Sequence, residues 1–236
     1  MLARRAVAEF VGTAFLVAAV IGSGIAAVRL SPHDVGLQLL ENSLITGGAL
    51  LALILALQPV SAAFNPIVTA VERALGLVTT RDAAALVAAQ FAGGFVGAVV
   101  ANLMFDLDAV NISHHHRAGS GIWLGEVIAT LGLLIVIFGT IRSGRTERVA
   151  FAVAGYILAA YWFTSSTSFA NPAVTVARMF SDTFAGIAPA SVAPFILFQI
   201  VGGVIGFALV RTLYPTVTDR WAATIAPASP APEVLS

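Results

Sequence analysis

Six continuous apolar runs, each about 20 residues long, constrain the fold of this chain more than any other feature of its sequence. They cover residues 6–28, 37–58, 82–104, 120–141, 149–166 and 190–213. A run of this length suits one helix that crosses the hydrocarbon core of a bilayer, whereas the strands of a membrane barrel would alternate apolar and polar residues. The composition agrees, since 58% of the residues are hydrophobic and only 10% are charged. The sequence therefore predicts an all-α membrane protein with six transmembrane helices.

The basic residues orient these helices, because cytoplasmic loops of membrane proteins carry an excess of positive charge. All twelve basic residues are arginines. If the N-terminus is inside, only Arg29, Arg117 and Arg178 fall on the outer side, against nine on the cytoplasmic side. The nine are Arg4, Arg5, Arg73, Arg81, Arg142, Arg145, Arg148, Arg211 and Arg220. We expect both termini on the cytoplasmic face of the cell (inner) membrane, with the first apolar run retained because it is too long for a signal peptide.

Several function classes are disfavoured by what the chain lacks. It has no cysteine, which excludes disulfides, thiolate metal sites and cysteine nucleophiles, and its net charge of zero gives no reason to expect nucleic acid as a partner. We expect no catalytic set, no cofactor and no metal site. His114, His115 and His116 fall between the third and fourth runs, where consecutive histidines favour a solvated loop over a pH-sensitive or metal-sensitive lid.

The chain also repeats itself, over residues 6–104 and 120–213. The segments AEFVGTAF (8–15), AAFNPIVTA (62–70) and AQFAGGFVGA (89–98) recur in the same order as GEVIATLG (125–132), SFANPAVTV (168–176) and FQIVGGVIGF (198–207). The shared landmarks are Glu9 and Glu126, Asn65 and Asn171, and Gln90 and Gln199. Each half has an odd number of spans, so the second copy must enter the membrane from the opposite side as an inverted repeat. Paired glycines in the third span of each half predict close helix packing across the pseudo-twofold axis.

We expect one membrane domain over residues 1–222. The remaining residues, 223–236, are rich in Ala and Pro and are expected to form a disordered tail.

Two Asn-Pro pairs, Asn65-Pro66 and Asn171-Pro172, each precede an amphipathic segment that is too short to cross the membrane alone. Proline is favourable at the first position of a helix, and asparagine is favourable at the cap before it. The pairs therefore predict two half-helices that enter from opposite faces and point their N-termini at each other near the membrane centre.

Such a meeting point has a defined chemistry. The partial positive charges of the two helix N-termini repel cations, and backbone in extended segments is tolerated at this depth only where it lines a cavity or is buried in protein. The segments 60–64 and 165–170 could present carbonyl oxygens beside the two Asn amides. This combination predicts a pore for small neutral solutes that form hydrogen bonds.

These motifs resemble the aquaporin family, the major intrinsic proteins, over about residues 6–213. The resemblance implies six tilted helices, two re-entrant half-helices, a pore through each monomer and a homotetramer. It also implies that Glu9 and Glu126 are buried carboxylates that hold the carbonyl-bearing loops, and that both motifs form the pore midpoint. The midpoint residues are Asn65, Pro66, Ile67, Asn171, Pro172 and Ala173.

The chain departs from the family pattern in two places. Ile67 stands where the family usually has Ala, for which a packing substitution is favoured over a narrowed midpoint. Val174 stands where the family has the arginine of the outer constriction. Arg178, one turn later, could replace that arginine, but a salt bridge with Asp182 at i+4 is favoured.

The other constriction positions map to Thr46, Ala159 and Ser168, with Ile45 as a rival to Thr46. These side chains and Val174 are small, so the constriction should be wide and neutral. The stretch 159–187 resembles a bacterial branch of the family, often encoded near arsenic-resistance functions, that also has Val at this position.

The leading hypothesis is a passive channel for water, glycerol-like polyols and, by the resemblance, neutral arsenite or methylated arsenicals. A water-selective aquaporin, a coupled secondary transporter and a non-conducting member of the family remain alternatives. The sequence leaves open the physiological solute, the gating and the pore radius.

Overall fold

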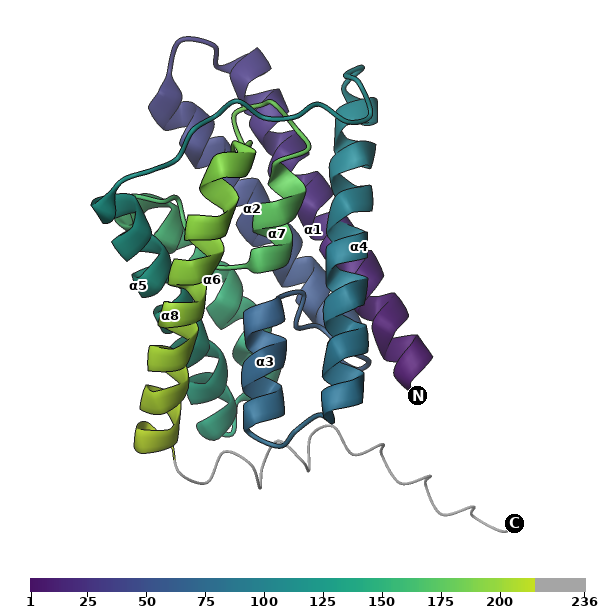
Figure 1. The fold of residues 1–236 in the computed structure, drawn as a ribbon, viewed down its shortest axis with the longest axis vertical. Helices are drawn as coiled ribbons and strands as arrows, with labels where there is room; N and C mark the ends of the chain where they lie inside the picture. Colours follow the sequence, from purple (N-terminus) through teal and green to yellow (C-terminus); the bar gives the residue numbers. More distant parts are fainter. Residues whose placement is uncertain (215–236) are drawn as a thin grey trace.

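The computed structural model describes residues 1–214, which form eight α-helices, one 3₁₀ turn and no β-strand (Figure 1). The helices are α1 (Leu2–Leu30), α2 (Val35–Leu57), α3 (Pro66–Ala74), α4 (Thr80–Met104), α5 (Ser120–Arg142), α6 (Val149–Phe163), α7 (Pro172–Arg178) and α8 (Pro189–Leu213). The 3₁₀ turn, Thr146–Arg148, precedes α6. The all-α prediction is confirmed. Arg220 and the tail expected at residues 223–236 lie outside the described residues.

Six of these helices are the counterparts of the six apolar runs. Within the described residues, five of them are long and apolar enough to cross a membrane: α1, α2, α4, α5 and α8. The sixth, α6, has 15 residues and is therefore about 22 Å long, against about 30 Å for a hydrocarbon core. It ends early because the chain leaves the helix at Thr164 and turns into the bundle.

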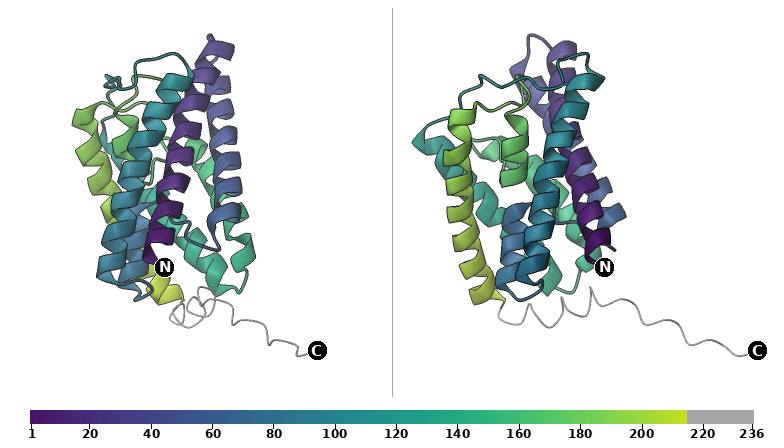
Figure 2. Two further views of the ribbon diagram at one scale, coloured as in Figure 1. Left: turned by 90° about the vertical axis from the view of Figure 1, so that its right-hand side faces the viewer. Right: turned by 45° about the vertical axis from the view of Figure 1, so that its right-hand side comes forward.

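The two halves of the chain pack in the same way. In the first half α1 packs mainly against α4 and α2, and in the second half α5 packs mainly against α8 and α6. The halves meet where α2 contacts α6 and where each short helix contacts a long helix of the other half, α3 against α8 and α7 against α4. The views in Figure 2 show the resulting bundle, in which the long helices surround the two short ones. This is the arrangement expected of an inverted repeat.

The two short helices lie in the middle of the bundle, one above the other (Figure 1). Asn65 and Asn171 precede them in extended conformation, and Pro66 and Pro172 occupy their first turns. Each Asn side chain accepts hydrogen bonds from backbone N–H groups of the helix that it caps. The Asn-Pro pairs are therefore helix starts. We call the end of the bundle at which Met1 lies the N-terminal end, and the opposite one the far end.

Glycines set the distance between the long helices of each half. A Cβ atom on Gly97 of α4 would lie 2.2 Å from the carbonyl oxygen of Ala14 in α1, and one on Gly202 of α8 would lie 2.5 Å from that of Val127 in α5. Gly94, in contrast, faces α7 of the other half. The sequence predicts close packing between the halves. The structure shows that the glycines also allow close packing of the helices within each half.

We expect Gly97→Ala to destabilise the fold by about 1 to 3 kcal/mol, because backbone atoms of α1 cannot move away from the added methyl group without separating the two helices. Gly48→Ala is the matched control, since nothing lies within 4 Å of a Cβ atom at that position of α2. Thermal unfolding in detergent measures both variants. Equal melting temperatures would contradict the packing role of Gly97.

Candidate functional site

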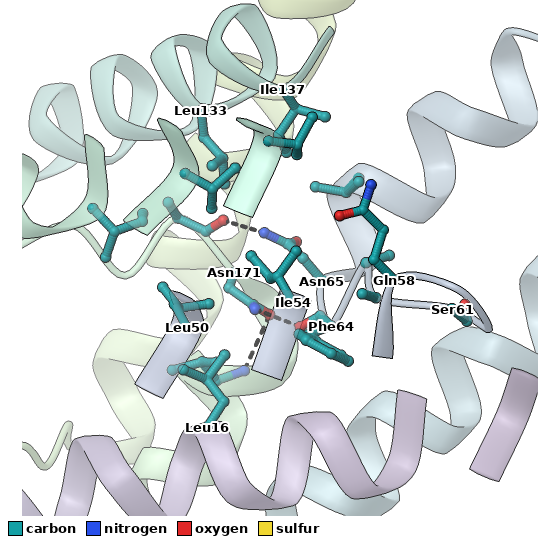
Figure 3. Close-up of a pocket in the computed structure, with 18 of the residues that line it drawn as sticks. Leu16, Leu50, Ile54, Gln58, Ser61, Phe64, Asn65, Leu133, Ile137 and Asn171 are labelled. Atoms are coloured by element: carbon teal, nitrogen blue, oxygen red, sulfur yellow. Dashed lines mark hydrogen bonds between the residues drawn. The ribbon is translucent and has the colours of Figure 1, made fainter. Parts of the chain in front are cut away.

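A cavity of about 610 Å³ runs between the two halves, from the exposed Met1 at the N-terminal end to Arg178 toward the far end. It is lined by residues of both short helices and of the segments before them, and by apolar side chains of α1, α2, α5 and α6. Figure 3 shows Leu16, Leu50, Ile54, Leu133 and Ile137 around the two asparagines. One wall of the cavity is therefore apolar, and the polar groups lie along the other.

The two asparagine side chains meet at the centre of this cavity. The amide nitrogen of Asn65 donates to the carbonyl oxygen of Ala170 at 2.8 Å, and that of Asn171 donates to the carbonyl oxygen of Phe64 at 2.7 Å (Figure 3). Each amide oxygen is used as a helix cap. Since each amide nitrogen carries two hydrogens, one of them remains for a solute.

The other four residues expected at the midpoint are not among those that line the cavity. Pro66, Pro172 and Ala173 lie beside it, within the first turns of their helices. Ile67 packs toward α8, where its Cγ2 atom lies 2.9 Å from the position of a Cβ atom on Gly203. The Ile in the first motif is therefore a packing residue and does not narrow the cavity.

Two buried carboxylates hold the segments that precede the short helices. Glu9 accepts hydrogen bonds from the backbone N–H groups of Ala63 at 2.9 Å and Phe64 at 2.7 Å, and from the side chain of Ser61 at 2.5 Å. It also accepts from the side chain of Gln90 at 2.8 Å, and the same nitrogen donates to the hydroxyl of Thr69. A carboxylate with this many donors fixes the loop in one conformation.

The second half repeats this arrangement. Glu126 accepts from the backbone N–H groups of Phe169 and Ala170, both at 3.0 Å, and from the side chain of Gln199 at 2.6 Å. Gln199 in turn donates to Thr175. In each half the Glu and the Gln are thus hydrogen-bonded to each other, while the Asn caps its short helix and donates to the other half.

The segments held in this way supply hydrogen-bond acceptors to the cavity. Residues 60–64 and 168–170 line it. Among the described residues, no group donates to the carbonyl oxygens of residues 60–63 or 167–169. Phe64, Ser168 and Ala170 have positive φ angles of 49°, 51° and 47°, a conformation that costs a non-glycine residue about 1 to 3 kcal/mol and persists where surrounding contacts impose it.

Toward the far end, the structure brings together three of the four residues expected at the constriction. Thr46, Ser168 and Val174 are buried and line the cavity. Ile45, the rival of Thr46, is 54% exposed and points out of the bundle. The hydroxyls of Thr46 and Tyr161 are 3.2 Å apart, so one hydroxyl hydrogen of the pair remains free.

The expectation for Ala159 is wrong. Ala159 is exposed on the outside of α6, and Tyr161 lines the cavity instead, together with Ile157 and Val153. These three residues recur every four positions and so share one face of the helix. Because α6 is apolar on all sides, hydropathy does not reveal which face is inside, but this spacing is a signal that could have been used.

The salt bridge expected between Arg178 and Asp182 is also absent from the described residues. Helix α7 ends at Arg178, so the two residues are not one helical turn apart. Asp182 instead pairs with His114, whose Nδ1 atom lies 3.0 Å from a carboxylate oxygen and whose backbone N–H donates to the other oxygen. This pairing lowers the pKa of Asp182 from its usual value.

The remaining histidines also lie at the far end. His115 is exposed, and its backbone carbonyl accepts a hydrogen bond from the N–H group of Ala188, which ties the loop before α5 to the start of α8. His116 is exposed. Among the described residues no group of three or more metal-ligating side chains comes together. The loop is therefore anchored to the bundle through its backbone and through His114.

The mouth of the cavity at the N-terminal end contains ionisable residues that the sequence analysis did not assign to the site. Arg5, Glu72 and Asp82 line it together with Gln58. Glu72 is buried at the end of α3, whereas Arg5 and Asp82 are partly exposed. The cavity thus has a charged entrance, an apolar wall and a polar centre.

Comparison with known proteins places the chain in a family. Residues 1–168 match the family model of the major intrinsic protein. The chain is 48% identical over 213 residues to the aquaglyceroporin AqpS of Rhizobium meliloti (strain 1021), which covers 90% of this chain and 91% of the relative. It is 28% identical over 250 residues to the aquaporin AqpM of Methanothermobacter thermautotrophicus (strain Delta H), covering 93% and 99%. The solved aquaglyceroporin from Plasmodium falciparum has the same fold, with a TM-score of 0.68 at 18% identity over 92% of this chain and 99% of that one.

The chain has no cysteine, so single cysteines can report which side chains face the cavity. We expect Tyr161→Cys and Thr46→Cys to react with a small water-soluble thiol reagent, because both side chains line the cavity. Ala159→Cys and Ile45→Cys are the matched controls on the outer surface of the same two helices. In liposomes these controls should stay unlabelled, and the reverse pattern would refute the assigned faces.

We expect Glu126→Gln to lower the free energy of unfolding by about 1 to 3 kcal/mol. Both carboxylate oxygens of Glu126 accept hydrogen bonds, and in the variant an NH₂ group would replace one oxygen and face an N–H donor. Glu9→Gln should have an effect of similar size. The control is Glu147→Gln, since Glu147 is exposed and its ion pair is with the neighbouring Arg148. Thermal unfolding in detergent measures all three, and a Glu126→Gln variant as stable as the control would contradict the role of the carboxylate.

Proposed function

The chain belongs to the major intrinsic protein family, and we propose that it is a passive membrane channel for water and glycerol-like neutral solutes. Family membership points to a channel rather than to an enzyme. The observation that carries the proposal is the pair of Asn amides at the centre of the long cavity, each with one N–H left for a solute. The similarity to proteins named aquaglyceroporin and aquaporin supports it.

A neutral polyol can replace its bonds to water inside this cavity. Hydroxyl groups can donate to the carbonyl oxygens of residues 60–63 and of residues 168 and 169, and can accept from the two Asn amides. The carbon atoms of the polyol can meanwhile contact the apolar wall opposite, formed by residues such as Leu50 and Leu133. Cations are disfavoured, because two helix N-termini direct partial positive charges at the centre.

The outer constriction determines which solutes can enter the channel. We place it at Thr46, Tyr161, Ser168 and Val174, all of which are buried and line the cavity toward the far end. The side chain of Val174 has no charge and no hydrogen-bond donor. The constriction should therefore discriminate between solutes less strongly than one that contains an arginine. Neutral arsenite, a triol comparable in size to glycerol, and methylated arsenicals of similar size fall within the proposed range of solutes.

The orientation and assembly belong to the same proposal. We assign the N-terminal end to the cytoplasm and the far end to the outside of the cell (inner) membrane, because arginines concentrate at the N-terminal end. We further propose a homotetramer, in line with the family resemblance. The many exposed apolar side chains on the outside of the helices, such as Phe15 and Phe151, suit contact with lipid or with other subunits.

A coupled transporter is the alternative of another class, since transporters also combine inverted repeats with broken helices. Coupling to protons or sodium ions would call for an ionisable residue at the centre. Here the central side chains are the two asparagines, and the nearby carboxylates Glu9 and Glu126 are occupied by the backbone donors that they hold. These contacts favour the passive channel.

We expect Val174→Arg to abolish passage of glycerol and arsenite while water still passes, because the long cationic side chain would fill the constriction. Val174→Leu, which adds bulk without charge, separates the two effects. Stopped-flow swelling of proteoliposomes with a panel of solutes measures both. If wild-type vesicles pass water but exclude glycerol, urea and arsenite, the broad channel is refuted in favour of a water-selective one.

A further inference from the structure

A second, smaller cavity of about 200 Å³ lies at the far end of the bundle. It is lined by residues of α2, of the loop before α5 and of the segments on either side of α7: Val35, Leu39, Asn42, His115, Arg117, Thr167, Arg178 and Phe184. Arg178 lines both this cavity and the long one. The two cavities therefore adjoin at Arg178.

Arg178 is buried, with 2% of its surface exposed, and no acidic side chain among the described residues forms an ion pair with it. Its Nε atom donates to the carbonyl oxygen of Ala185, and its guanidinium lies 3.4 Å from the centre of the Phe169 ring. Its two terminal nitrogens donate to no group in the described part of the chain. A buried guanidinium with free donors beside a cavity is prepared to bind an anion.

Arg117 brings a second guanidinium to the same place. The loop between α4 and α5 crosses over α7, where the N–H groups of Asn111 and Ser113 donate to the carbonyl oxygens of Phe180 and Met179. Arg117 then donates to the carbonyl oxygens of Gly186 at 2.9 Å and Phe184 at 3.1 Å.

The Arg117 guanidinium stays positive beside the cavity. The Cζ atom of Arg117 lies 5.2 Å from the centre of the Phe169 ring, which Arg178 also contacts. Burial lowers the pKa of Arg117 to about 10, which leaves it charged at neutral pH.

None of the residues that line this cavity is acidic. Glu126 attracts both guanidinium groups from outside the lining, where it accepts hydrogen bonds from backbone N–H groups and Gln199. Asp182, also outside the lining, pairs with His114. His115 is partly desolvated at the rim of this cavity, which lowers its pKa, and the charges of Arg117 and Arg178 lower that pKa further.

We propose that this cavity is a binding site for small monocarboxylates. The carboxylate would accept hydrogen bonds from the free guanidinium nitrogens of Arg178 and Arg117, which match its planar, two-oxygen geometry. The short hydrocarbon part would contact Val35, Leu39 and Phe184, which make up the apolar side of the cavity. The apolar contact distinguishes a monocarboxylate from chloride, which has no such part.

The proposal does not depend on conduction, since it concerns binding at the far end. It goes beyond the channel function by placing an anion next to the long cavity, at the residue that the two cavities share. A carboxylate bound there would occupy N–H donors of Arg178. Fewer of these donors would then be available to a neutral solute that enters the long cavity.

Isothermal titration calorimetry on the purified full-length protein in detergent tests the proposal, with sodium propionate as the ligand. Propionamide, its neutral isostere, and sodium chloride are titrated under the same low ionic strength. We expect saturable binding of propionate, and binding at least about tenfold weaker for propionamide and for chloride. Equal binding of propionamide would refute the role of charge, and equal binding of chloride would refute a carboxylate site.

Variants test the two arginines. Arg117→Gln should weaken propionate binding about tenfold or more, since it removes a charge-assisted hydrogen bond. Arg178→Lys, which keeps the charge of the buried residue but not its fork of donors, should also weaken binding. Arg29→Gln is the matched control, because Arg29 lies at the same end, donates to the carbonyl oxygen of Phe105 and contacts its ring, but does not line the cavity. If Arg29→Gln weakens binding as much as Arg117→Gln does, the site is not where we place it.

Discussion

The reciprocal bonds between the two asparagines and the opposite backbone are the constraint on which the rest of the structure depends. Asn171 donates to the carbonyl oxygen of Phe64, and Phe64 in turn donates its N–H to Glu9. In the other half Asn65 donates to Ala170, which donates its N–H to Glu126. The residue before each Asn is thus hydrogen-bonded through both its N–H group and its carbonyl oxygen. These two bonds hold the residue at positive φ.

This constraint explains why the centre of the cavity is built from a repeated set of residues. A short helix needs a cap, its approach loop needs acceptors for its N–H groups, and the two halves need a fixed distance. The Asn amide supplies the cap and the link to the other half, the Glu supplies the acceptors, and the Gln connects the Glu to the short helix through Thr69 or Thr175. The amide oxygens of Gln90 and Gln199 are buried without a hydrogen-bond partner among the described residues, but the Glu oxygens and the Asn amides are paired. Replacing one of these Glu or Asn side chains would therefore leave its partner unpaired.

The same constraint separates the features that the sequence predicts from those that it does not. The helices, the caps and the paired landmarks follow from apolar length, from Asn-Pro chemistry and from order along the chain, all of which are local or periodic. The face of α6 and the surroundings of Arg178 are set by tertiary packing. The sequence misplaces Ala159 because α6 is apolar all round, and it suggests the wrong partner for Arg178 because α7 ends at that residue. Loops beyond a helix end carry no periodic signal.

The centre and the far end of the cavity therefore differ in how readily their side chains can be substituted. At the centre, the Asn and Glu side chains form the hydrogen bonds that hold the backbone, so a substitution there destabilises the segments before the short helices. Toward the far end, Val174 donates only its backbone N–H, to Asn171, and the Thr46 hydroxyl pairs with that of Tyr161. The arginines nearby are held by backbone carbonyl oxygens and by the Phe169 ring, which leaves their charge without an acidic partner. Arg178, one helical turn after Val174, thus brings a positive charge to both the side cavity and the long cavity.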